Sequence, residues 1–155
     1  IRFLGSSRQE ISLFPATARS RAGHELYLVQ LGEDPSDFKP MPAVGKGAYA
    51  GAPGRGAALW ADRGEVIMAR QNVFLDLGFP KHEAAVMLMR CDLAQEIRQW
   101  LKKRHLSQAA GADILGISAP RINEIVKNRV EKVSVDYLLG LCAKAGISVT
   151  VKLAA

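Results

Sequence analysis

The side chains whose types and spacing could do chemistry gather in one short stretch, residues 118–127, S-A-P-R-I-N-E-I-V-K. Arg121 and Asn123 match base edges in the major groove of DNA, because Arg pairs well with guanine and Asn with adenine. Gln108 and Lys127 could hold phosphates, contacts that position a protein without specifying a sequence. These four residue types therefore predict a surface that reads double-stranded DNA.

The predicted DNA-binding set includes four neighbours of these residues: Ser118, Ala119, Pro120 and Glu124. Ala119 and Pro120 offer an apolar contact, for example to the methyl group of thymine. Glu124 has two interpretations. It accepts a hydrogen bond from cytosine, or its charge disfavours the wrong sequences; we favour the second.

Two short helices joined by a tight turn, residues 107–128, must position these side chains. Ser107 is expected to cap the first helix, since its hydroxyl can accept from an unpaired backbone N–H. Gly116 follows the first helix, where a left-handed conformation favours glycine. Ser118 is expected to cap the second helix, and Pro120 fits its first turn. The second helix buries the stripe Ile122, Ile125 and Val126.

This stretch resembles the helix-turn-helix of the lambda-repressor-like (Xre) family. The resemblance rests on a small residue in the first helix, a glycine at the turn and apolar residues around it: Ala112, Leu115, Gly116, Ile117, Ile122 and Ile125. Gly111 departs from the family pattern. It should cost about 1 kcal/mol of helix propensity and leave the first helix thinly packed. The alternative interpretation is a helical hairpin that binds nothing.

The charge of the chain is concentrated where the helix-turn-helix lies. Residues 81–155 carry twelve basic and seven acidic side chains, which supplies +5 of the net charge of +6. A surface that binds a polyanion needs such an excess. Many soluble domains share a modest basic balance, so the charge supports the DNA interpretation without establishing it.

Composition limits the other classes of function. The two cysteines, Cys91 and Cys142, fall within apolar helical patterns and are expected to be buried free thiols. No apolar run approaches the ~20 residues that span a bilayer. We expect a cytoplasmic protein with no cofactor, no metal site and no membrane partner.

The N-terminal part, residues 1–49, predicts a strand over 1–4 and helices over about 8–14 and 16–30. Its sequence resembles the HigB-type toxins of the RelE/ParE superfamily through F-L-G-S-S, L-F-P, G-H-E-L-Y-L-V-Q-L-G and D-P-S-D-F-K-P. The resemblance implies a strand, two helices and a curled antiparallel sheet in a protein that cleaves messenger RNA. It ends near residue 49, before the sheet that carries most of the family's cleaving side chains. No catalytic residue is therefore predicted here.

Residues 50–70 are rich in glycine and alanine and predict a linker. The G-K-G motif before it lacks the strand and helix of a phosphate-binding loop. Residues 71–155 then predict the DNA-binding domain. A helix over about 81–104 carries the apolar stripe Val86, Met89, Leu93, Ile97, Trp100 and Leu101, and a last helix runs from Ser134 to Gly146.

From residue 72 to the end, the chain resembles the HigA-type antitoxins, Xre-type proteins with a C-terminal strand. The resemblance rests on N-V-F-L-D-L-G, L-G-I-S-A-P-R-I and the closing residues. It implies a truncated toxin fused to a transcriptional regulator that represses its own toxin-antitoxin operon. One alternative is an antitoxin that mainly neutralises a HigB-type toxin. Another is a residual ribonuclease in residues 1–49.

The closing residues 147–153, I-S-V-T-V-K-L, alternate like a half-buried strand. Its apolar face would be Ile147, Val149, Val151 and Leu153. Because a strand edge needs a partner, we expect a homodimer through this strand, on a palindromic operator. Pairing with residues 72–75 is the alternative. The predicted fold class is mainly α: a lambda-repressor-like helix-turn-helix bundle with a C-terminal dimerising β-strand, plus an N-terminal α-helical fragment.

Overall fold

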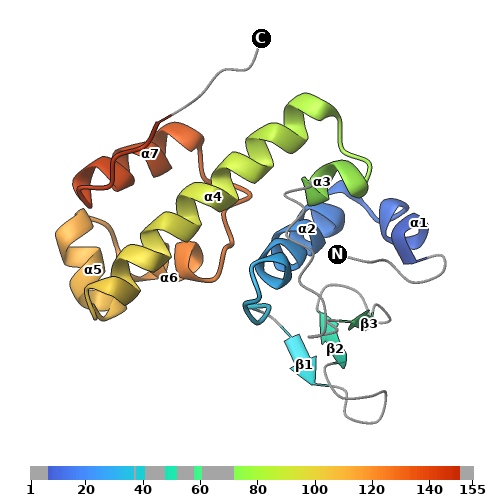
Figure 1. Ribbon diagram of the computed structural model, residues 1–155, viewed down its shortest axis with the longest axis horizontal. Helices are drawn as coiled ribbons and strands as arrows, with labels where there is room; N and C mark the ends of the chain where they lie inside the picture. The colour runs from blue at the N-terminus through green and yellow to red at the C-terminus, as the bar shows by residue number, and fades with distance from the viewer. Residues whose placement is uncertain (1–6, 37, 41–47, 52–57, 61–71, 151–155) are drawn as a thin grey trace. The chain divides into compact units, whose positions relative to one another are not determined.

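A computed structural model of the chain describes residues 7–36, 38–40, 48–51, 58–60 and 72–150 (Figure 1). The chain divides into two compact units, Ile1–Leu88 and Met89–Ala155. The described elements, in chain order, are α1 (Ser7–Ser12), α2 (Ala16–Gln30), β1 (Phe38–Pro40), β2 (Ala48–Gly51), β3 (Ala58–Trp60), α3 (Val73–Asp76), α4 (Lys81–Lys103), α5 (Gln108–Leu115), α6 (Ala119–Val126) and α7 (Val135–Lys144).

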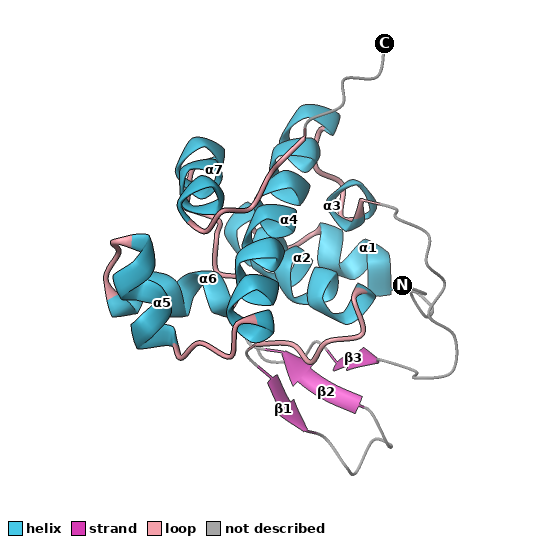
Figure 2. Cartoon of the chain, turned by 60° about the vertical axis from the view of Figure 1, so that its left-hand side comes forward, coloured by secondary structure: helices cyan, strands magenta, loops and turns pink. Residues whose placement is uncertain are grey.

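The first unit contains a small antiparallel sheet in the order β1-β2-β3 (Figure 2). In the register of the sheet, Tyr49 lies opposite both Pro40 and Leu59. β3 forms within residues 50–70, for which the sequence predicts a linker. The helix predicted over 16–30 coincides with α2, and the strand predicted over 1–4 lies outside the described residues.

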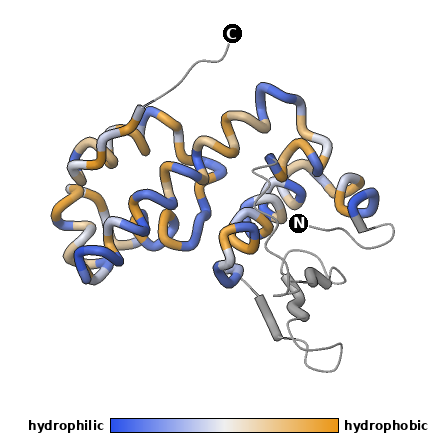
Figure 3. Tube along the Cα trace, viewed as in Figure 1, coloured by the Kyte–Doolittle hydropathy of each residue, from blue (hydrophilic) through white to orange (hydrophobic). Residues whose placement is uncertain are grey.

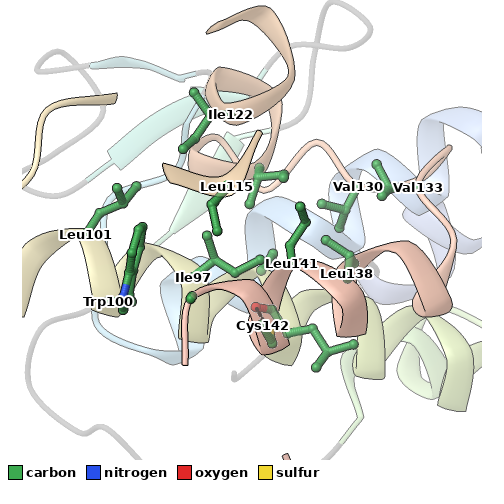
Figure 4. Packing of buried hydrophobic residues seen from close by; sticks show 14 of the residues in the cluster. Ile97, Trp100, Leu101, Leu115, Ile122, Val130, Val133, Leu138, Leu141 and Cys142 are labelled. Atoms are coloured by element: carbon green, nitrogen blue, oxygen red, sulfur yellow. Dashed lines mark hydrogen bonds between the residues drawn. The ribbon is translucent and has the colours of Figure 1, made fainter. Parts of the chain in front are cut away.

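The second unit is built around the C-terminal part of α4, against which the last three helices bury their apolar stripes. Hydrophilic and hydrophobic residues alternate along these helices (Figure 3), as amphipathic helices require. Figure 4 shows most of the core that results. The buried residues of this core are Leu93, Ala94, Ile97, Trp100, Leu101, Ala112, Leu115, Ile122, Ile125, Val130, Val133, Leu138, Leu141, Cys142 and Ala145.

The stripe predicted along α4 is only partly buried. Its C-terminal members join the core, but Val86 and Met89 are 41% and 39% exposed. The core of the second unit begins at Leu93, so this earlier part of the stripe lies beyond it. Ile114 of α5 is also half exposed.

Gly111 is a point of close packing, which corrects the expectation of a thinly packed helix. A Cβ atom built at Gly111 would overlap the side chain of Leu101 from α4 and would come within 3.1 Å of Ile122 Cδ1 from α6. Gly111 itself is buried. The glycine therefore lets α5 lie close to both helices, and the helix propensity that it loses is offset by that contact.

The predicted C-terminal dimerising strand is wrong for the residues that the structure describes there. Residues 147–150 adopt neither helix nor strand, and Val151 and Leu153 lie outside the described residues. Ile147 instead closes α7: its N–H donates to Cys142 O at 2.8 Å, after Gly146 in the left-handed region. Val149 is exposed. Residues 72–75, the alternative strand partner, begin α3 and cannot pair as a strand.

Both thiols are free and buried, as predicted. Burial raises the pKa of Cys142 to about 11, and it raises the pKa of Cys91 further still. These groups are therefore neutral at pH 7, which suits the core. Within the described ranges, every helix is too short or too polar to span a bilayer.

A buried glycine, Gly111, and an exposed one, Gly140, together test the packing at α5. Gly111→Ala should lower the free energy of unfolding by about 1 kcal/mol, because overpacking outweighs the gain in helix propensity. Gly140→Ala in α7 is the matched control, since a Cβ there meets nothing within 4 Å, and it should raise stability by about 0.5–1 kcal/mol. Urea unfolding measures both. Equal stabilisation by the two substitutions would contradict the close contact at Gly111.

Candidate DNA-binding surface

Helix α5 is capped at both of its ends. Ser107 accepts a hydrogen bond from Ala110 N at 3.1 Å and so caps α5, as predicted. Gly116 is left-handed (φ 65°, ψ 43°), and Ile117 N donates to Ala112 O at 3.0 Å. This closure satisfies carbonyl groups at the end of α5 and fixes the direction in which the chain enters α6.

A lysine from the last helix strengthens the same turn. Lys144 Nζ donates to Leu115 O at 3.0 Å, across 29 residues of sequence. A cation at this end of a helix also lies where the peptide dipoles favour positive charge. The contact ties α7 to the turn, so the start of α6 is supported from outside the helical pair as well as from within it.

Ser118 has the extended backbone of a capping residue (φ −73°, ψ 152°), but its side chain accepts no capping bond from the described helix. Ser118 therefore occupies the N-cap position of α6, as predicted, without contributing a side-chain capping bond. Pro120 lies in the first turn, as predicted, and its missing N–H leaves fewer donors there for a cap to satisfy. The Ser118 side chain is exposed, so its hydroxyl can donate to a phosphate or a base.

Asn128 lies just after α6 and stabilises its C-terminal end, a role that the sequence did not predict. It is left-handed (φ 52°) and buried, a conformation that Asn tolerates better than most residues. Arg129 N then donates to Glu124 O at 2.8 Å. The Asn128 side chain donates to Cys91 Sγ at 3.7 Å, which anchors this end of α6 to α4. An Asn two residues past the apolar stripe was the available signal.

Two of the predicted DNA contacts are already joined to each other. Asn123 Nδ2 donates to Gln108 Oε1 at 3.1 Å, so the start of α5 meets the middle of α6. An Asn side chain has two N–H groups and one carbonyl oxygen, so this bond leaves it one donor and its acceptor for adenine. The amide group of Gln108 keeps its donors for a phosphate. The pair thus fixes Asn123 without using up its reading edge.

Arg121 and Glu124 form a second pair on the outer face of α6. Arg121 Nη1 lies 2.8 Å from Glu124 Oε2, and both side chains are substantially exposed. The Arg121 guanidinium also lies over the ring of Tyr137, 5.7 Å from its centroid. Tyr137 comes from α7 and was not predicted. Its only sequence signal was a large aromatic side chain three residues after the capping Ser134.

The other predicted contacts surround these pairs. Ala119 and Pro120 are exposed at the start of α6, and Lys127, at its end, is half-buried. The expected apolar stripe is buried on the opposite side, with Ile122 and Ile125 fully covered. α6 therefore turns its polar side chains outward as a set.

The adjacent side chains of His24 and Glu25 in α2 are both engaged in hydrogen bonds. His24 Nδ1 is 2.7 Å from Ser20 O, and the Glu25 carboxylate accepts from Ser36 N and Oγ at 2.6 and 2.7 Å. These bonds brace α2 and the loop that follows it. Among the described residues, no group of three or more His, Cys, Asp or Glu side chains could hold a metal ion.

Two helices joined by a glycine turn, with the second carrying an outward polar face, define a helix-turn-helix unit. The family described as "Helix-turn-helix domain" matches residues 73–154, more than half of the chain. The chain belongs to this helix-turn-helix family, and DNA binding is the class of function that this membership supports. Comparison with curated proteins and with solved structures finds no match.

The left-handed residue that ends α6 gives a test of how the recognition helix is held. Asn128→Ala should lower the free energy of unfolding by about 1–2 kcal/mol more than Asn128→Gly, because a Cβ without a local hydrogen bond is costly in this conformation. Both variants lose the bond to Cys91, so the difference isolates the backbone. Thermal or urea unfolding measures it. Equal losses would show that the Cys91 contact, and not the backbone, makes Asn128 important.

Proposed function

We propose that the protein is a sequence-specific transcriptional regulator of the antitoxin type that represses its own toxin-antitoxin operon. The main support for DNA reading is the arrangement of side chains on the outer face of α6. There, two side chains suited to base edges, Arg121 and Asn123, are each held by a neighbour, Glu124 and Gln108. The resemblance of residues 72–155 to HigA-type antitoxins supports the regulatory role.

In this proposal α6 enters the major groove and its side chains divide the work. Arg121 reads guanine and Asn123 reads adenine through their remaining hydrogen-bonding groups. Gln108, Ser118 and Lys127 contact phosphates and fix the position of the protein on DNA. The basic excess of residues 81–155 attracts the duplex before any base is read.

We also propose that the protein binds a palindromic operator as a homodimer, and that the dimer interface is not the C-terminal strand. Helix-turn-helix proteins commonly read two half-sites one helical turn apart, and the two-fold symmetry of the protein matches that of the operator. Selection of binding sites from a randomised duplex library tests this, together with light scattering of the complex. Inverted repeats bound by two chains support it, and a single half-site bound by one chain contradicts it.

The division between reading and positioning gives a direct test. Arg121→Ala should cost about 1–3 kcal/mol on the selected site and relax the preference at one base pair. Lys127→Ala should weaken binding to all sequences alike and reduce the salt dependence. Fluorescence anisotropy at several salt concentrations measures both. If Arg121→Ala bound the selected site like the wild type, α6 would not be the reading helix.

A second candidate function, the binding of a HigB-type toxin, is favoured by the packing of α2 on α3. Val73, Phe74 and Leu77 are fully buried. A Cβ at Gly23 of α2 would lie 2.5 Å from Phe74 Cε1, and the His24 ring meets the Phe74 ring edge-on, with centroids 5.2 Å apart. α2 therefore lies very close to α3.

Charged groups of α1 and α2 also contact α3 and the residues that follow it. Arg8 Nε donates to Asp76 O at 2.9 Å, and the Arg19 guanidinium lies 4.4 Å from the centroid of the Phe79 ring. α3 belongs to the stretch that matches the helix-turn-helix family, whereas α2 lies outside it. The helix that covers the matched domain thus comes from the toxin-like segment. We propose that α3 can accept the corresponding helices of an intact HigB-type toxin.

Displacing α2 tests the second candidate. Gly23→Leu should push α2 from Phe74 and free the face of α3 for a purified HigB-type toxin, so calorimetry should detect tighter binding than with the wild type. Gly140→Leu is the matched control, because that position is open. Retained DNA binding by both variants would show that the second unit is intact. No gain in toxin affinity for Gly23→Leu would rule out this surface.

A further inference from the structure

Arg121 is held from two sides by residues of two different helices. Glu124, one turn further along α6, takes its Nη1 in an ion pair of 2.8 Å. Tyr137, from α7, places its ring 5.7 Å from the guanidinium carbon. Glu124 bonds one nitrogen of the guanidinium group, and the guanidinium carbon lies over the ring of Tyr137. Figure 1 shows α6 and α7 as separate helices of the second unit, joined by a loop.

The position of Tyr137 is fixed by the structure around it. Its backbone N–H donates to Ser134 Oγ at 3.2 Å, the cap that begins α7. The next residue, Leu138, is fully buried in the same core as Ile122 of α6. The residue as a whole is 39% exposed. Tyr137 is thus an exposed side chain on a rigid support, and that support is shared with the recognition helix.

The chemistry of the guanidinium group allows this support and base reading at the same time. Arginine has five N–H donors in one plane. The bond to Glu124 uses one of them. The contact with the Tyr137 ring is an electrostatic attraction between the cation and the ring, and it takes up no oxygen or nitrogen acceptor. The remaining donors can still bind O6 and N7 of guanine. A side chain already held in one geometry loses less conformational freedom when it binds.

The Glu124 carboxylate should lower the overall affinity for DNA, which distinguishes a positioning role from a general contribution to affinity. Glu124 places a negative charge on a face that meets phosphates, so it weakens binding to every sequence. Its benefit would be confined to duplexes in which Arg121 finds its base. A residue of this kind lowers affinity overall and raises the ratio between specific and non-specific binding.

We infer that Tyr137 and Glu124 are positioning residues for Arg121 and so help to determine which DNA sequence the protein selects. The inference rests on the proposed DNA-reading function and deepens it, because it extends the reading surface from α6 to the start of α7. It assigns Tyr137 a role in specificity that its place outside the helix-turn-helix would not indicate.

The experiment compares discrimination with overall affinity in the full-length protein. The first duplex is selected from a randomised library with the wild-type chain. The second duplex is the same sequence with one base pair changed, the one at which Arg121→Ala relaxes the preference. Anisotropy titrations with both duplexes give the discrimination ratio. Glu124→Gln should lower this ratio about two- to five-fold, the range expected of a surface ion pair, while binding the replaced duplex more tightly. Asp136→Asn is the matched charge control: it removes an exposed carboxylate from α7 and should leave the ratio unchanged.

Two substitutions at Tyr137 separate the ring from the hydroxyl. Tyr137→Leu removes the aromatic face and should lower the ratio about two- to five-fold, as expected for an exposed cation–aromatic contact. Tyr137→Phe keeps the face and should keep the ratio. Thermal unfolding of each variant identifies any general loss of stability. In an Arg121→Ala background, neither Glu124→Gln nor Tyr137→Leu should change the ratio further, because the group they position is gone.

The outcomes distinguish this inference from the function on which it rests. If Glu124→Gln tightens both duplexes equally, or Tyr137→Leu leaves the ratio unchanged, the positioning role is overturned and DNA reading by Arg121 stands. If the wild-type chain selects no sequence at all, the proposed function fails and this inference fails with it. Unequal effects on the two duplexes that vanish in the Arg121→Ala background support the inference.

Discussion

The close approach of α5 to its neighbours at Gly111 is the contact on which the second unit depends. With hydrogen in place of a side chain, the backbone of α5 can lie against Leu101 of α4 and Ile122 of α6. Interiors of proteins are packed as densely as organic crystals, so even one added methyl group is felt at a contact of this kind. The orientation of α6 follows from it, because Ile122 is buried on one side of α6 while the residues proposed to read DNA lie on the other.

Around that contact, polar bonds hold the ends of the recognition helix. Gly116 and Lys144 secure the turn before it, and Asn128 secures its last residue against α4. The outer face carries pairs of polar groups, Gln108 with Asn123 and Arg121 with Glu124. If these side chains contact DNA as proposed, the contacts between them hold them in place before DNA arrives. Ordering them beforehand lowers the entropic cost of binding.

The family domain and the compact units of the chain do not share a boundary. The helix-turn-helix family matches residues 73–154, whereas the first compact unit extends to Leu88. α3 lies in the overlap, and its apolar residues are covered by α2 through Gly23. Buried apolar residues need a cover, and here a segment outside the matched domain supplies it. The N-terminal segment is therefore part of how this chain buries the start of its DNA-binding domain.

The sequence alone determined the local features of this protein. Periodicity, capping residues and glycine positions predicted α2, α4 and the helix-turn-helix, because backbone sterics and one-sided burial act over a few residues. Tertiary structure decided the rest. An alternating pattern at residues 147–153 predicted a strand that pairs with its copy in a second chain, but residues 147–150 adopt neither helix nor strand. The alternative partner within the chain, residues 72–75, begins the helix α3. Likewise, Tyr137 meets Arg121 only because α6 and α7 share one core. Contacts between residues distant in sequence depend on packing, which no local pattern records.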